Sequence, residues 1–195
     1  MNFPYKNTTI KIAAHVYEPS EDSFLLAEAA LTQIKGTEQI LEVGCGSGII
    51  SKVIKENTKA RVTGVDINPY AVKCTKESGV EAIRGDLLSC LKGKFDMIIF
   101  NPPYLPTRKE ERIKDWLGVA LDGGYDGRRI IYRFLEDCNA HLADNGRILM
   151  VLSSLTGIEE VKSRMGSLGY AVEDTMEERF IFEQLKVITA RKKYL

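Results

Sequence analysis

The sequence lacks the features of secreted proteins, of proteins stabilised by a structural metal and of membrane-spanning proteins. Its 195 residues include four widely spaced cysteines with no CxxC pair, and two histidines. This spacing favours reduced thiols over a disulfide or zinc framework. No apolar run approaches the roughly 18 residues that a membrane helix requires, and the N-terminal MNFPYKNTT lacks a signal-peptide core. We therefore expect a cytoplasmic protein without a metal site.

The chain also has no net charge at pH 7. The 27 basic residues balance the 27 acidic ones, so no global field favours nucleic acid or an anionic membrane. Hydrophobic residues make up 44% and charged residues 28%, as in ordinary soluble domains. With no repeat, low-complexity tract or linker, residues 1–195 are predicted to form a single domain.

What the sequence does contain is an alternation of short apolar segments and amphipathic segments. Strands are predicted at 39–43, 61–67, 81–85, 95–100 and 146–154, with two antiparallel strands within 170–192. Helices are predicted at 20–34, 47–56, 69–78, 87–91, 128–142 and 157–168. Residues 105–127 have no clear strand, and their charged part, 107–116, is either a solvated segment or a substrate lid. The pattern predicts an α/β fold: a mainly parallel sheet, covered by helices on both faces, with a C-terminal antiparallel hairpin.

A glycine-rich turn follows the first of these strands. In LEVGCGSGI, Gly44, Gly46 and Gly48 have the spacing GxGxG, which differs from the GxGxxG of dinucleotide-binding proteins. Such a turn lets a ligand approach the backbone beside a helix N-terminus, although glycines at this point also serve packing.

Acidic residues follow the next two strands. Asp66 lies 22 residues after Gly44 and could accept both hydroxyls of a ribose; alternatively it caps the helix that begins at Pro69. Asp86 could accept a hydrogen bond from an adenine amino group, or cap a helix. Together with the glycine-rich turn they lie at successive strand C-termini, the edge where open α/β sheets bind ligands.

This combination resembles the class I methyltransferases, over about residues 39–154. The resemblance implies a Rossmann-like, mainly parallel seven-stranded sheet and S-adenosyl-L-methionine as the cofactor. In that family the acidic residue of the first strand, matched by Glu42, lies near the methionine end of the cofactor.

The fourth strand ends in FNPPY. Each proline holds the residue before it extended, and neither can donate to a sheet, so the strand stops there in a stiff corner. The segment resembles the [DN]PP[YFW] motif of enzymes that methylate planar NH2 groups. Asn101 and Pro102 would accept the two hydrogens of such a group, and Tyr104 would stack on it. The alternative is a simple strand-ending turn.

Two further segments resemble HemK-type glutamine methyltransferases. HVYEPSEDSFLL (His15–Leu26) is similar to the N-terminal signature of the short eukaryotic and archaeal members, and LDGGYDGRRIIYRFL (Leu121–Leu135) to the segment that follows NPPY. The first segment is also consistent with an ordinary capped amphipathic helix. The resemblance implies cofactor contacts by Ser23, Glu42, Gly44, Gly46, Asp66, Asp86, Leu87 and Asn101.

The implied reaction is methylation of the glutamine amide in the Gly-Gly-Gln motif of a class I peptide chain release factor. Residues 1–38 would cover substrate and cofactor, and residues 39–195 would form the catalytic core. Short members of the family work with a small zinc-binding activator, which we expect near the strand at 81–85. The alternatives are N6-adenine methylation of DNA or RNA, lysine methylation, a non-catalytic cofactor-binding subunit, and an NAD-dependent oxidoreductase.

Overall fold

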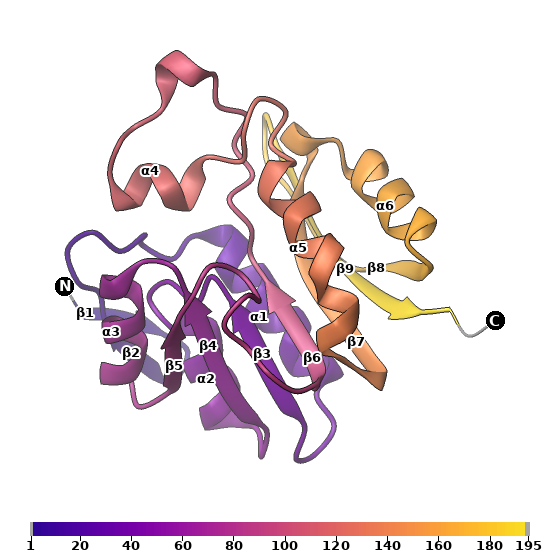
Figure 1. Ribbon diagram of the computed structural model, residues 1–195. Coiled ribbons are helices and arrows are strands. Elements are labelled where there is room, and N and C mark those ends of the chain that lie inside the picture. The colour runs from indigo at the N-terminus through magenta and orange to yellow at the C-terminus, as the bar shows by residue number, and fades with distance from the viewer. Residues whose placement is uncertain (1, 194–195) are drawn as a thin grey trace.

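A seven-stranded sheet forms the centre of the computed structural model, which describes residues 2–193 (Figure 1). Its strand order is β5-β4-β3-β6-β7-β9-β8. The strands are β3 (Gln39–Val43), β4 (Arg61–Asp66), β5 (Glu81–Arg84), β6 (Phe95–Phe100), β7 (Leu142–Ser153), β8 (Tyr170–Arg179) and β9 (Gln184–Lys192). Strands β3 to β7 pair in parallel, whereas β9 is antiparallel to both β7 and β8. The predicted parallel sheet and terminal hairpin are confirmed.

Helices cover both faces of this sheet, as predicted. They are α1 (Glu21–Gln33), α2 (Ile49–Asn57), α3 (Pro69–Glu77), α5 (Arg129–His141) and α6 (Ile158–Ser167). The short helix α4 (Trp116–Leu121) lies beyond the strand ends (Figure 1) and contributes no residue to the core clusters. Apolar residues of α1 and α2 pack on one face, and those of α5 and α6 pack on the other. Within residues 2–193, no helix combines the length and apolarity needed to cross a bilayer.

Strand β7 shows why the central strands are continuously apolar. Ile148 and Met150 pack in the cluster with α5 and α6, whereas Leu149 and Val151 pack in the cluster with α1 and α2. A strand buried on both faces has no solvent side, so polar alternation disappears.

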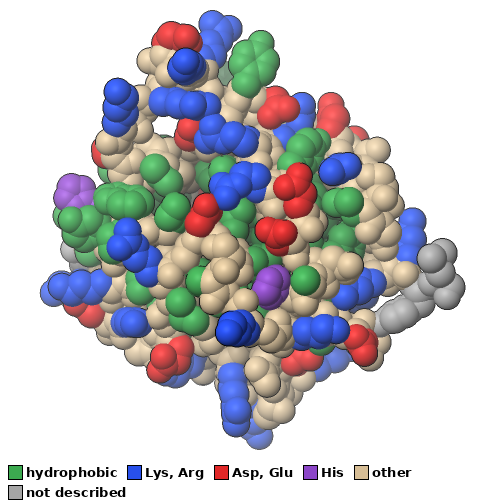
Figure 2. All heavy atoms as spheres, viewed as in Figure 1, with side chains coloured by type: hydrophobic (Ala, Val, Ile, Leu, Met, Phe, Trp, Pro, Cys, Tyr) green, Lys and Arg blue, Asp and Glu red, His purple; other side chains and the backbone are tan. Residues whose placement is uncertain are grey.

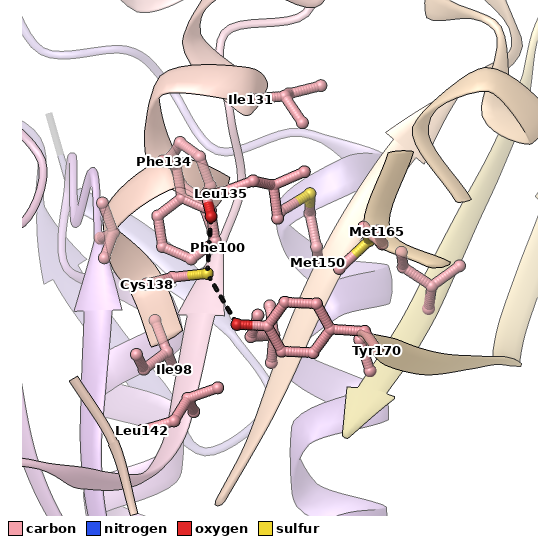
Figure 3. Packing of buried hydrophobic residues seen from close by; sticks show 14 of the residues in the cluster. Ile98, Phe100, Ile131, Phe134, Leu135, Cys138, Leu142, Met150, Met165 and Tyr170 are labelled. Carbon is pink, nitrogen blue, oxygen red and sulfur yellow. Dashed lines mark hydrogen bonds between the residues drawn. The ribbon is translucent and has the colours of Figure 1, made fainter. Parts of the chain in front are cut away.

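The core on the α5 side also anchors the end of β6. The ring of Phe100 lies against Phe134 of α5, with centroids 4.7 Å apart, and both rings are buried (Figure 3). In the same cluster the thiol of Cys138 and the hydroxyl of Tyr170 are 3.3 Å apart, so both polar groups have a partner (Figure 3). Because Phe100 is fixed by packing, the residue that follows it starts from a defined position.

A small N-terminal hairpin was not predicted from the sequence. It consists of β1 (Asn2–Tyr5) and β2 (Thr8–Lys11), which form a separate two-stranded sheet. Tyr5 stacks on Phe24 of α1 at 4.4 Å and donates a 2.8 Å hydrogen bond to Glu28. Isolated hairpins are only marginally stable, so this one depends on α1, a long-range contact that a local pattern does not reveal.

One local prediction was wrong. Residues 87–91 form a turn and not a helix; Leu87 has φ of +50°, which interrupts helical geometry. Within 105–127, where the sequence shows no clear strand, lie the 3-10 turn η1 (Lys109–Glu111) and the six-residue helix α4, which was not predicted. The side chain of Asp115 accepts a 2.7 Å hydrogen bond from the Gly118 N–H and caps α4.

Candidate active site

A cavity of about 850 Å³ lies at the carboxyl ends of β3, β4 and β6. Every residue proposed from the sequence for cofactor or substrate lines it: Ser23, Glu42, Gly44, Gly46, Asp66, Asp86, Leu87, Asn101, Pro102 and Tyr104. Three segments complete the wall: the loop before α1, helix α4, and the turn between β8 and β9. The cavity is therefore at the sheet edge where the sequence placed the site.

The glycine-rich turn forms the floor of the cavity. Gly44, Gly46 and Gly48 have φ values of +66°, +54° and +79°, which residues with a Cβ adopt rarely. A Cβ on Gly48 would also lie 3.0 Å from the Thr75 Cα, so α3 packs closely against the turn. A Cβ on Gly44 would lie 3.8 Å from the carbonyl oxygen of Asn101, so this part of the turn adjoins the end of β6.

Asp66 lies beside the glycine-rich turn and binds its backbone. Its carboxylate accepts hydrogen bonds from the backbone N–H groups of Gly46 at 2.9 Å and Asn68 at 2.8 Å. The cap of α3 is Asn68, which accepts from Tyr70 N–H at 2.9 Å, so the capping alternative for Asp66 is wrong. Burial raises the pKa of Asp66 against the lowering effect of these backbone bonds. A carboxylate has about four acceptor positions, so Asp66 keeps capacity to accept from a ribose hydroxyl.

Glu42 lies deeper in the same wall. It is only 3% exposed, and one carboxylate oxygen accepts both the N–H of Ser51, at 2.9 Å, and the Ser51 hydroxyl. Burial raises its pKa to about 8, and the charge of Asp66 acts in the same direction. Without a ligand Glu42 is therefore mostly protonated near neutral pH, and a cation bound beside these two acids would favour its ionised form.

Asp86 and Leu87 line the next part of the cavity. Asp86 forms a 2.8 Å ion pair with Arg133 of α5, an interaction that the sequence did not indicate. Leu87 follows it with a positive φ, which is uncommon for a residue with a branched side chain and is often found at functional sites.

The end of β6 is held by the start of α1. The Asn101 amide donates a 3.3 Å hydrogen bond through Nδ2 to the Ser23 hydroxyl, and Tyr104 donates one of 3.3 Å to Asp22. Asp22 is only 5% exposed and also accepts the N–H of Ser23 at 2.6 Å. The buried start of α1 thus contacts both ends of the NPPY segment.

Asp22 is a site residue that sequence reasoning missed. In the segment SEDS, Asp22 has the position of an ordinary acidic residue in the first turn of a helix. Its burial follows only from the contact with Tyr104, 82 positions away. Ser20 lies at the N-cap position of α1, but its hydroxyl bonds to Glu21 instead of capping the helix. Burial raises the pKa of Tyr104, as do the charges of Asp22 and Glu183, so its phenol stays neutral.

Comparisons with known proteins agree with this geometry. Residues 20–116 match the family model described as methyltransferase small domain. The chain is 41% identical over 187 residues to MJ0928 of Methanocaldococcus jannaschii, which carries the name of a protein N5-glutamine methyltransferase, covering 93% of this chain and 94% of that one. The chain belongs to the protein N5-glutamine methyltransferase family.

Two further relatives are less similar in sequence but cover almost the whole chain. The methyltransferase HEMK2 of Homo sapiens is 32% identical, covering 91% of this chain and 90% of its own. Among solved structures, the Mtq2 subunit of the E. cuniculi Mtq2–Trm112 complex superposes with a TM-score of 0.76 at 24% identity, covering 92% of this chain and 99% of that one. That complex is described as responsible for methylation of the translation termination factor eRF1. The class I methyltransferase fold is thereby confirmed.

The cofactor of this family is S-adenosyl-L-methionine, and the cavity fits it. The glycine turn leaves space that a Cβ would fill, Asp66 retains acceptor capacity, and Glu42 supplies a buried acid near a cationic ligand. Within the described part of the chain no group of three or more His, Cys, Asp or Glu is placed to hold a metal.

Proposed function

We propose that this protein transfers a methyl group from S-adenosyl-L-methionine to the side-chain amide nitrogen of a glutamine, in the Gly-Gly-Gln motif of a class I peptide chain release factor. The observation that carries the proposal is the position of NPPY. Asn101 directly follows β6 beside the glycine turn, and Tyr104 lies on the other side of the prolines, both in the wall of one cavity. The names of the relatives support the same reaction.

The cofactor is assigned to the side of the cavity that β3, β4 and β5 form. Asp66 would hold its ribose, Asp86 and Leu87 would lie near its adenine, and Glu42 would lie near its methionine end. Gly44 and Gly46 provide the backbone approach, and Ser23 and Asn101 lie at the boundary with the substrate. When bound, the cofactor supplies an electrophilic methyl group on a sulfonium.

The protein's task is then to orient a weak nucleophile. The lone pair of an amide nitrogen is delocalised, so its hydrogens must be held by acceptors and its nitrogen aimed at the methyl group. Asn101 donates a hydrogen bond from Nδ2 to Ser23, so its Oδ1 is available as one acceptor. The carbonyl of Pro102 supplies the second acceptor. The neutral Tyr104 ring, held by Asp22, stacks on the amide plane. Orientation of this kind is worth up to about 7–11 kcal/mol of the barrier.

A glutamine amide suits this chain better than a nucleobase does. Binding a nucleic acid requires a basic surface. Figure 2 shows Lys and Arg interspersed with Asp and Glu over the face it draws, and the whole chain is neutral. The release factor glutamine methyltransferase of Borreliella burgdorferi is 40% identical to this chain. The aligned part covers 70% of this chain and 52% of that protein.

The specificity of the acceptor pocket provides the test. The purified chain is incubated with labelled cofactor and three acceptors: a release factor, its Gln→Glu variant at the motif, and an adenine-containing oligonucleotide. We expect transfer to the first alone, because a carboxylate would face two acceptors and be repelled. Sites built on hydrogen bonds discriminate by about 10⁴–10⁵. Transfer to the oligonucleotide and not to the release factor would contradict the proposal.

We further propose that a small zinc-binding activator covers β5. This strand is one of the two edges of the sheet, and Ile83 on it is exposed, as are Ile67 and Tyr70 nearby. An exposed apolar edge strand invites pairing. The E. cuniculi relative was solved as a complex with Trm112. Ile83→Asp should abolish co-purification with the activator, whereas Leu168→Ala, at another exposed apolar residue, should not; retained binding by Ile83→Asp would place the partner elsewhere.

A further inference from the structure

The turn that joins β8 and β9 carries an apolar tip that the reaction described above does not use. Phe180, Ile181 and Phe182 form this tip, and Ile181 and Phe182 are 90% and 91% exposed. Large apolar side chains exposed to this degree side by side are unusual on a soluble protein and mark interaction sites. All three also line the cavity that contains Asn101 and Tyr104. The tip is therefore continuous with the active site.

The tip is held in place before any ligand arrives. The N–H of Phe180 donates to the carbonyl of Glu183 at 2.7 Å and closes the turn. Ser153, at the end of β7, donates a 2.5 Å bond to the Glu183 carboxylate, and Ser154 accepts the N–H of Gln184 at 3.0 Å. These bonds tie the turn to β7 and to the cavity wall, whereas the apolar side chains remain exposed. A surface ordered in advance loses little entropy on binding.

The chemistry of the substrate explains why such a surface is needed. A Gly-Gly-Gln segment offers only peptide planes and one amide side chain, so the pocket at Asn101 recognises the glutamine and little else. Affinity for the rest of the protein must come from residues outside the pocket. Aromatic rings supply large contact areas and pack well on flat glycine peptide groups and on neighbouring apolar side chains.

We infer that the tip formed by Phe180, Ile181 and Phe182 is the docking surface for the segment of the release factor that flanks the target glutamine. This inference rests on the proposed function and adds the element that selects an intact protein over a free amide. The flanking segment lies across the tip at the cavity mouth while the glutamine reaches Asn101. The tip contacts neither the methyl donor nor the reacting nitrogen, so it contributes to KM and not to kcat.

The test is the double variant Ile181→Ala/Phe182→Ala, assayed with the activator present against an intact release factor. We expect KM to rise about tenfold or more with kcat nearly unchanged. Cofactor affinity by calorimetry and the melting temperature should match the unsubstituted enzyme, because these side chains pack against little of the fold. Tyr125→Ala is the matched control: Tyr125 is an aromatic residue 82% exposed that lies outside the cavity wall, and its removal should leave KM unchanged.

A second experiment locates the contact directly. A photo-crosslinking benzoylphenylalanine in place of Phe182 should crosslink to the release factor next to its Gly-Gly-Gln motif, and one in place of Tyr125 should not. An unchanged KM in the double variant, or loss of cofactor affinity together with activity, would overturn the docking surface. Failure of the unsubstituted enzyme to methylate any release factor would instead contradict the proposed function, and this inference with it.

Discussion

The two halves of the cavity are built in different ways. On the cofactor side, the contacts of Glu42 and Gly46 join residues close in sequence: Glu42 to Ser51, 9 positions apart, and Gly46 to Asp66, 20 positions apart. The ion pair of Asp86 with Arg133, 47 positions away, is the exception. On the acceptor side, Asn101 contacts Ser23 across 78 positions and Tyr104 contacts Asp22 across 82. The first half is a local βα unit with backbone donors, whereas the second is assembled by the tertiary fold.

This difference has a functional consequence. A local unit that binds the cofactor can be shared by enzymes with many acceptors, because it does not depend on the rest of the chain. The acceptor side depends on α1 and on the β8–β9 turn, so it can change while the cofactor side is kept. The two halves should therefore respond separately to substitution at Asn101, Asp66 and Asp22, and a variant at Glu42 tests the charge of the cofactor side.

Asn101→Ala should have the largest effect. It removes the acceptor that aligns the target nitrogen, and transfer to a release factor should fall by about 10²–10³-fold, as for loss of one preorganised polar group in other active sites. Calorimetric affinity for S-adenosyl-L-methionine should stay within a few-fold of the original. Full methylation activity in Asn101→Ala would show that NPPY only ends the strand and does not align the acceptor.

Asp66→Ala should give the opposite pattern. Loss of charge-assisted bonds to the ribose should weaken cofactor affinity by about 1–3 kcal/mol. At saturating cofactor the rate of transfer should largely recover, because the acceptor side is intact. Unchanged affinity in calorimetry would remove Asp66 from the site, and a rate that saturation fails to restore would break the separation between the halves.

Asp22→Asn tests the support of the acceptor side. The amide keeps the size of the side chain but weakens the bond from Tyr104, so kcat should fall about tenfold, in line with the loss of a hydrogen bond to a charged group. Cofactor affinity should not change. Tyr104→Phe, which removes the same bond from the other end, should give a similar loss, and the double variant should lose little more. Additive losses would show that the two groups act independently.

Glu42→Gln tests the cofactor side without cofactor, through the pH dependence of stability. The pKa of Glu42 is about 8 in the folded protein against an ordinary 4.5, so between these values the folded state binds more protons than the unfolded state. The free energy of unfolding therefore falls as pH rises, by about 1 kcal/mol per pH unit from this group. Urea denaturation at several pH values should show a flatter profile for Glu42→Gln. An identical slope would mean that Glu42 is ionised in the folded protein.

The same contrast explains how much could be predicted from the sequence. The strands at 39–43 and 95–100 were placed at their observed bounds, since buried apolar runs and their breakers are local. The glycines of the turn and the acidic residues at the strand ends line one cavity for the same reason, whereas Ser23 reaches it through the tertiary fold. Asp22 and the apolar tip at Phe180–Phe182 were missed, because burial of an acid and exposure of aromatic residues depend on which elements meet. The helix predicted at 87–91 failed at Leu87, whose positive φ is imposed by the tertiary fold.

The most direct test of the account is the location of the transferred methyl group. A release factor is incubated with the enzyme, its activator and labelled S-adenosyl-L-methionine, and the product is fragmented by tandem mass spectrometry. The geometry at Asn101 and Pro102 predicts one methyl group on the side-chain amide nitrogen of the Gly-Gly-Gln glutamine, absent when Asn101→Ala replaces the enzyme. A methyl group on a lysine, or on any residue other than that glutamine, would contradict it.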